Sequence, residues 1–128
     1  MYEILIAGAM IDIAIIGGGP AGLTAAIYAA RAGKHVAVLE RGSTGGQIIS
    51  APLVENYPGI DQISGADLAK RIYDQALGAG AGYESARVER AERRQNGFAL
   101  HTDRGIFEGR GLILATGARS RPLGLARE

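Results

Sequence analysis

A chain of 128 residues has room for a single domain with a modest core, and its 47% hydrophobic and 21% charged content is typical of folded globular proteins. The formal net charge of +1 is too small to indicate a nucleic-acid partner or a polybasic membrane contact. Because the chain has no cysteine, disulfides, thiolate metal sites and redox thiols are excluded within it, and we expect a cytoplasmic location.

The N-terminal segment is apolar but matches neither a secretory signal nor a membrane span. Glu3 and Asp12 interrupt it, no basic stretch precedes it, and it ends in a glycine cluster. We therefore expect residues 1–11 to be an extension or leader, and we expect no membrane partner.

A strand, a glycine-rich loop, a helix and a second strand follow in that order. The β-branched run Ile11–Ile16 predicts a buried parallel strand, and Pro20 suits the first turn of a helix that extends through Ala32. The second strand is predicted over His35–Glu40. The helix residues expected on one buried face are Leu23, Ala26, Ile27 and Ala30.

The middle of the chain predicts a long loop and a second helix. Residues 41–63 show neither helical nor strand periodicity, which indicates an ordered loop of the kind that often carries function. Ser64 to Asp67 resembles a capping box and opens a helix through Leu77. The residues expected to face inward are Leu68, Ile72 and Ala76.

The last third predicts short strands. Turn signals at Asn96-Gly97 and Asp103–Gly105 separate three segments and indicate a small antiparallel meander. Its predicted strands are 88–93, 98–102 and 106–109, followed by a buried parallel strand over 111–117. The predicted fold is a three-layer α/β Rossmann-type domain over 12–117, with a parallel sheet and a small antiparallel β-meander, and 118–128 is a truncated linker.

Three glycines in the first loop fit the dinucleotide-binding pattern G-x-G-x-x-G. Gly17 permits the tight turn, Gly19 allows backbone amides to approach a diphosphate, and Gly22 allows the helix to pack closely on the strand. Glu40 ends the second strand, where a carboxylate can accept both hydroxyls of an adenosine ribose. This pattern alone does not distinguish FAD from NAD. The two histidines have no patterned partners, so we predict neither catalytic nor metal-binding residues.

Four motifs occur in one order: GGGPAG (17–22), GGQ (45–47), VENYPG (54–59) and ATGA (115–118). Together they resemble the FAD domain of low-molecular-weight thioredoxin reductases and their relatives, which include the flavoprotein reductase of alkyl hydroperoxide systems and thioredoxin-reductase-like ferredoxin–NADP reductases. The resemblance covers nearly the whole chain from Asp12 to Glu128. It implies FAD as the ligand.

The resemblance also implies roles for individual residues on the adenosine side of FAD. The residues expected around the diphosphate are Gly17, Gly19, Pro20 and Ala21, with Gly22 behind them. Glu40 would hold the adenosine ribose with Arg41 and Gly42 beside it, and backbone groups of Ala86 or Val88 would reach the adenine.

On the flavin side, the resemblance implies that Gly46 and Gln47 lie along the ribityl chain and that Asn56 lies near the isoalloxazine ring. Ala115, Thr116 and Gly117 would pack against the diphosphate and ribityl region. Two of these assignments keep a purely structural alternative: Asn56 could organise a turn before Pro58, and Thr116-Gly117 could simply end a strand.

In the family pattern, ATGA is followed by an inserted NAD(P)H domain and then by a return strand that ends in Gly-Asp; neither is present here. We therefore expect the FAD-binding module of a thioredoxin-reductase-like oxidoreductase that is not competent alone and meets NAD(P)H only through a missing domain or partner. The alternative is a non-catalytic adenine-dinucleotide-binding module or one subunit of a split flavoprotein.

The absent return strand would leave one side of the strand at 111–116 open. Open apolar strand edges favour pairing with other chains. We expect self-association, completion by a second polypeptide, or weak FAD binding. Residues 4–9 could cover an edge only by antiparallel pairing or exchange between chains, because the link to the first strand is too short for a parallel crossover.

Overall fold

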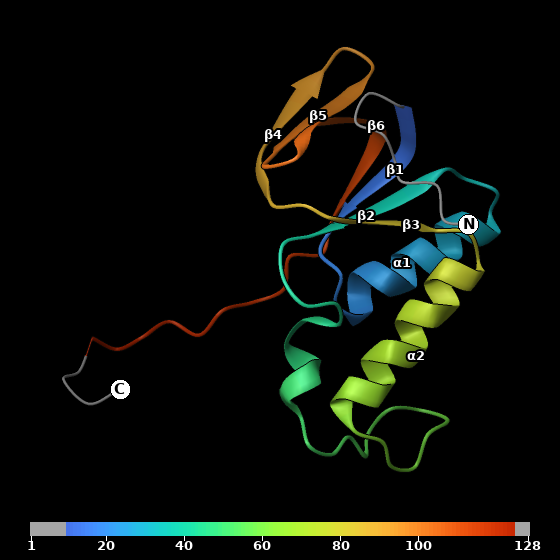
Figure 1. The fold of residues 1–128 in the computed structure, drawn as a ribbon, viewed down its shortest axis with the longest axis vertical. Coiled ribbons are helices and arrows are strands. Elements are labelled where there is room, and N and C mark those ends of the chain that lie inside the picture. The colour runs from blue at the N-terminus through green and yellow to red at the C-terminus, as the bar shows by residue number, and fades with distance from the viewer. Residues whose placement is uncertain (1–9, 125–128) are drawn as a thin grey trace.

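The computed structural model describes residues 10–124, so the predictions for residues 1–9 and 125–128 lie outside the described part. The described strands form one sheet in the order β3-β2-β1-β6-β5-β4 (Figure 1). Its elements are β1 (Met10–Ile16), α1 (Pro20–Arg31), β2 (Val36–Glu40), α2 (Gly65–Gly78), β3 (Gly82–Ser85), β4 (Val88–Arg94), β5 (Gly97–Thr102) and β6 (Gly105–Leu114). β1 pairs in parallel with β2 and β6, β2 with β3, and β4–β5–β6 is antiparallel, which confirms the predicted fold class.

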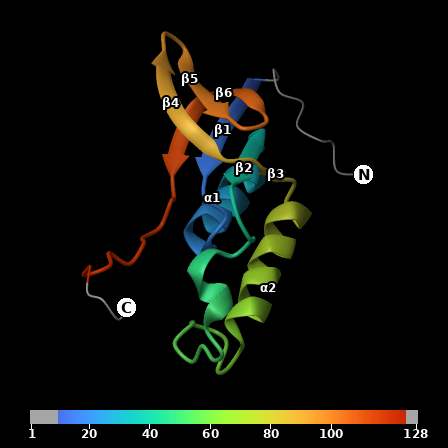
Figure 2. The ribbon, with the colours of Figure 1, turned by 60° about the vertical axis from the view of Figure 1, so that its left-hand side comes forward.

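Two buried clusters lie on opposite faces of the parallel strands. Along β2, Val36 and Val38 join the cluster under the helices, whereas Ala37 and Leu39 join the cluster that includes Leu100 and Phe107 of the meander. This alternation follows the two-residue period of a strand that is covered on both faces. Figure 2 shows α1 and α2 together on one side and the β4–β5 hairpin on the other. The parallel strands are therefore the middle of three layers.

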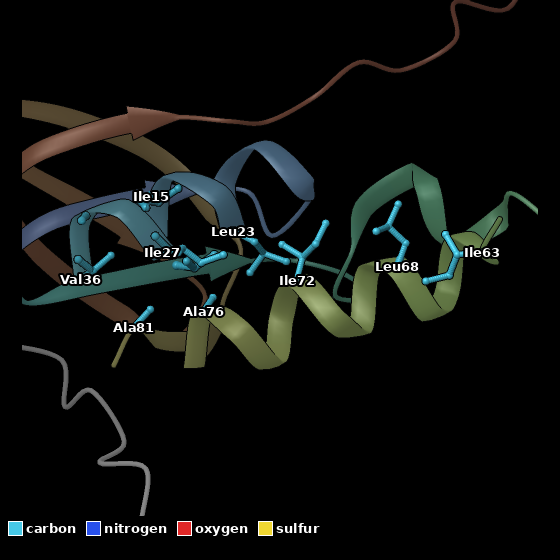
Figure 3. Packing of buried hydrophobic residues seen from close by; sticks show 12 residues of the cluster. Ile15, Leu23, Ile27, Val36, Ile63, Leu68, Ile72, Ala76 and Ala81 are labelled. Carbon is cyan, nitrogen blue, oxygen red and sulfur yellow. The ribbon is translucent and has the colours of Figure 1, made fainter. Parts of the chain in front are cut away.

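The two helices pack against each other and against the sheet through small and aliphatic residues. Leu23 of α1 and Ile72 of α2 lie next to each other, and Leu68 extends the cluster along α2 (Figure 3). The buried positions predicted for α2 are confirmed, and so are those for α1 except that Ala29 is buried and Ala30 only partly so. The Ser64 hydroxyl accepts from the Asp67 amide at 3.0 Å, as the capping box predicts.

The prediction of two separate strands over 106–109 and 111–117 is wrong. One strand, β6, runs from Gly105 to Leu114, and residues 115–117 lie beyond its end. At Gly109 this strand is paired with Phe98 of β5 on one side and with Ile11 of β1 on the other. A side chain there would stand 3.1 Å from the Ala14 Cβ, so the glycine permits close approach rather than ending the strand.

The long loop contains more local structure than its sequence predicted. Gly46–Ser50 forms a short 3₁₀ helix, and isolated bridges join Val54 to Ile63 and Tyr57 to Ile60. A single short helical turn is too brief to leave a periodic pattern of apolar residues. The four-residue strand β3 was also not predicted. Within residues 10–124, no helix is long and apolar enough to cross a membrane.

Candidate functional site

A cavity of about 670 Å³ opens at the carboxyl ends of the parallel strands. Ligands of open α/β sheets bind in this position because the loops that leave neighbouring strands diverge there. The lining residues come from the loop after β1, the end of β2, the 3₁₀ helix and the segment after β6. They are Gly17, Gly19, Pro20, Ala21, Glu40, Arg41, Ser43, Gly46, Gln47, Ile48, Ile49, Ser50, Ala115, Thr116, Gly117 and Ala118.

The glycine loop is packed tightly at two of its three motif positions. Gly17 has a φ of 114°, and a Cβ there would lie 2.1 Å from the Ala115 carbonyl oxygen. A Cβ at Gly22 would lie 1.9 Å from the Gly17 carbonyl oxygen. Both positions therefore exclude a side chain, and the contacts hold the start of α1 against β1 and the segment after β6.

Gly19 differs because the protein itself leaves room beside it. The nearest atoms to a Cβ there would be the Gly46 Cα at 3.9 Å and the Gly45 carbonyl oxygen at 4.0 Å. Gly19 lines the cavity and is the N-cap of α1. The missing side chain therefore leaves space for a ligand.

The N-terminus of α1 is suited to an anion. Gly19 gives the helix no side-chain cap, Pro20 occupies its first turn, and that turn contains no acidic residue. The backbone amides at a helix N-terminus and the helix dipole both favour negative charge. A diphosphate in the cavity would meet this end of the helix at Gly19, Pro20 and Ala21.

Glu40 is held in place by two backbone amides at the end of β2. Gly18 donates to its Oε2 at 2.7 Å, and Gly42 donates to its Oε1 at 2.8 Å. Each carboxylate oxygen has a further lone pair, so the side chain can still accept hydrogen bonds from ligand hydroxyls. The Gly42 amide thus supports Glu40 although Gly42 itself does not line the cavity.

A second cavity of about 150 Å³ adjoins the first. It shares with the first cavity Gly17, Glu40, Arg41 and Thr116, and it adds Ile16, Leu39, Ala86 and Val88. The structure therefore brings Ala86 and Val88, which were predicted near the adenine, to the side of Glu40 that faces the meander.

Three predicted residues, Gly22, Gly42 and Asn56, line neither cavity. Gly22 packs against Gly17 and Gly42 supports Glu40, but Asn56 has no such link to the site. Asn56 is exposed in the loop after the 3₁₀ helix.

Gln47 does line the cavity, and its side-chain amide donates to the Ala118 carbonyl. The lining residues that were not predicted are Ser43, Ile48, Ile49, Ser50 and Ala118. Ala118 is the last residue of the ATGA motif and could have been included from it, whereas the other four lie outside the four motifs.

A tyrosine–threonine pair lies beside the glycine loop and was also not predicted. The Thr44 hydroxyl donates to the Tyr83 hydroxyl at 3.0 Å. Burial raises the pKa of Tyr83 above its usual 10, and the hydrogen bond from Thr44 opposes that rise. The phenol is therefore neutral at physiological pH.

Comparison with known proteins agrees with this geometry. A family model described as Pyridine nucleotide-disulphide oxidoreductase matches residues 11–128. The chain is 43% identical over 119 residues to the 34.2 kDa protein in the rubredoxin operon of Clostridium pasteurianum, covering 92% of this chain and 39% of that protein. It is 38% identical to the thioredoxin reductase of Helicobacter pylori, covering 93% of this chain and 39% of that protein.

Solved structures give the same result. The thioredoxin reductase from Streptococcus pyogenes superposes with a TM-score of 0.87 at 40% identity, covering 93% of this chain and 39% of that one. The enzyme from Lactococcus lactis gives 0.87 at 36% identity, with coverage of 90% and 38%. The chain thus spans about two fifths of the length of these relatives. It belongs to the pyridine nucleotide-disulphide oxidoreductase family.

Proposed function

We propose that this chain binds FAD as the cofactor module of a thioredoxin-reductase-like flavoprotein oxidoreductase. The observation that carries the proposal is a single cavity bounded by the uncapped N-terminus of α1 and by the Glu40 carboxylate. These two features complement the diphosphate and the adenosine ribose of a dinucleotide. The space beside Gly19, which a side chain would fill, fits the same group.

The choice of FAD over NAD rests on the lining residues of the larger cavity that lie outside the glycine loop and Glu40. Gly46, Gln47 and Ala115–Gly117, which the resemblance implies for the ribityl chain, all line the cavity. When bound, FAD would supply two-electron chemistry. The chain's own residues would bind and orient FAD. They would not exchange electrons with a disulfide, because the lining residues include no thiol. Electrons from NAD(P)H would have to come through another domain or partner.

The absorption spectrum of the purified chain tests this proposal. We expect a bound-flavin absorbance change when the chain is titrated with FAD at equilibrium, and no bleaching when NADPH is then added. Bleaching by NADPH alone would show that the chain is a reductase by itself and would contradict the module assignment. Absence of any such change up to high micromolar FAD would contradict the ligand assignment.

Removing the ribose acceptor is expected to weaken FAD binding. Glu40→Ala should cost about 1–3 kcal/mol of binding free energy, because ligand hydroxyls and the Gly18 and Gly42 amides would all lose an acceptor. Titration calorimetry measures the change, with Glu89→Ala in the exposed part of β4 as a matched control. Equal affinity in the parent and Glu40→Ala would exclude Glu40 from the site.

The open side of β6 is expected to affect both the association of the chain and its affinity for FAD. Gly111–Leu114 pairs with β1, but within residues 10–124 no strand pairs with its other side, and Leu114 is 69% exposed. Unpaired strand edges favour association. We propose that the chain either pairs through this edge, with itself or with a second polypeptide, or binds FAD weakly.

Light scattering combined with flavin titration tests this expectation. We expect a concentration-dependent increase in mass or a dissociation constant above the micromolar range. Leu114→Lys should shift any self-association toward monomer, because charge on an edge strand opposes edge-to-edge pairing. A parent that stays monomeric and holds FAD at submicromolar affinity would contradict the proposal.

A further inference from the structure

Gly18, the middle residue of the glycine triplet, is fixed from three directions. Its amide donates to Glu40 at 2.7 Å, and its carbonyl accepts from the Gly45 amide at 2.9 Å. The third contact is the ring of Tyr83 in β3. A Cβ at Gly18 would lie 2.6 Å from the Tyr83 hydroxyl and 3.1 Å from the Glu40 Cβ, so tyrosine and glutamate both lie against this residue.

Tyr83 is itself held at both ends. Its ring makes an edge-to-face contact with Tyr73 of α2, with centroids 5.1 Å apart and an interplanar angle of 85°. Its hydroxyl accepts from Thr44 at 3.0 Å. Thr44 precedes Gly45, so its bond to Tyr83 and the Gly45–Gly18 bond together secure the end of the exposed segment that follows Glu40.

This segment includes Gly42, whose amide is the second donor to Glu40. Arg41, Gly42 and Ser43 are exposed, so little packing holds them in position. The anchors at Thr44 and Gly45 therefore limit how far the Gly42 amide can move from the carboxylate. Both amides that orient Glu40 thus depend on elements that contact Tyr83.

We propose that Tyr83, held by Thr44, is a positioning residue for the ribose site of the bound adenine nucleotide. It keeps Gly18 and the 41–45 segment in the geometry in which Glu40 accepts from a free 2′-hydroxyl. The inference rests on the proposed function, because it assigns a role within the same cavity. It extends that function by assigning the positioning of the ribose acceptor to Tyr83 and Thr44, which line neither cavity.

The test compares binding of ADP and 2′-deoxy-ADP, which differ only in the hydroxyl that Glu40 would accept. We expect the parent to prefer ADP by about tenfold or more, and Glu40→Gln to lose most of that preference. Tyr83→Phe and Thr44→Val should each reduce the preference by about two- to tenfold. Thr44→Ser keeps the hydroxyl donor and should therefore retain the parent's preference for ADP. Tyr28→Phe, at a position on α1 that is 75% exposed, is the matched control and should behave like the parent.

The outcomes separate this inference from the proposed function. If the parent binds neither FAD nor ADP, the proposed function fails. If the parent binds ADP and 2′-deoxy-ADP equally, the positioning role is overturned. It is also overturned if the parent prefers ADP and Tyr83→Phe or Thr44→Val leaves the ratio of the two affinities unchanged, whether or not both affinities fall. A purely structural defect would weaken both ligands equally, whereas a positioning role changes the ratio.

Discussion

The substitution Gly19→Val is expected to lower the affinity for FAD roughly hundredfold while lowering the stability of the ligand-free chain by no more than about 1 kcal/mol, the usual effect of a poor N-cap residue. Gly19 has a φ of −78°, which an ordinary residue adopts, and a Cβ there would have no protein atom closer than 3.9 Å. The backbone conformation and the space at the Cβ position therefore both permit a side chain at this residue. The space it fills is the space that the diphosphate would occupy at the N-terminus of α1.

Two measurements check this result: FAD titration, and thermal unfolding without FAD. Gly78→Val is a matched control, because Gly78 ends α2 outside the cavity and has no atom within 4 Å of a Cβ position. We expect the control to bind FAD like the parent. If Gly19→Val bound FAD as tightly as Gly78→Val, the diphosphate could not lie against the start of α1.

The part of the cavity that could be predicted is the part formed by motif residues at the carboxyl ends of parallel strands. Gly17 and Gly19 follow β1, Glu40 ends β2, and Thr116 follows β6. Because the carboxyl ends of parallel strands meet at one edge, identifying these strands was enough to bring the residues together. The register confirms it, since Ile16 pairs with both Leu39 and Leu114.

Other features depend on contacts between distant segments and leave no local signal. The strand break predicted between residues 109 and 111 is absent, because β6 is there held between two partners and approaches Ala14 closely at Gly109. The 3₁₀ helix at Gly46–Ser50 is too short to have a period. Tyr83 contacts the glycine loop because β3 pairs with β2. A strand of four residues is too short for its sequence to indicate this pairing.

The second large effect is expected at Gly22, and it concerns the fold rather than the ligand. Gly22→Ala should lower the free energy of unfolding by about 3 kcal/mol without FAD, at the upper end of the usual cost of overpacking. The added Cβ would lie 1.9 Å from the Gly17 carbonyl oxygen and 3.0 Å from its carbon, so backbone rather than a flexible side chain must move.

Gly17 cannot move aside easily. Its amide donates to the Leu39 carbonyl at 2.9 Å, and its own Cβ position is only 2.1 Å from the Ala115 carbonyl oxygen. The strain must therefore be relieved by moving α1 away from β1, which would also separate Leu23 and Ile27 from the core they share with Ile15. Chemical denaturation of the ligand-free chain measures the loss, with Gly19→Ala as the control that should unfold like the parent. Equal stability of Gly22→Ala and Gly19→Ala would mean that α1 does not lie as close to Gly17 as the structure places it.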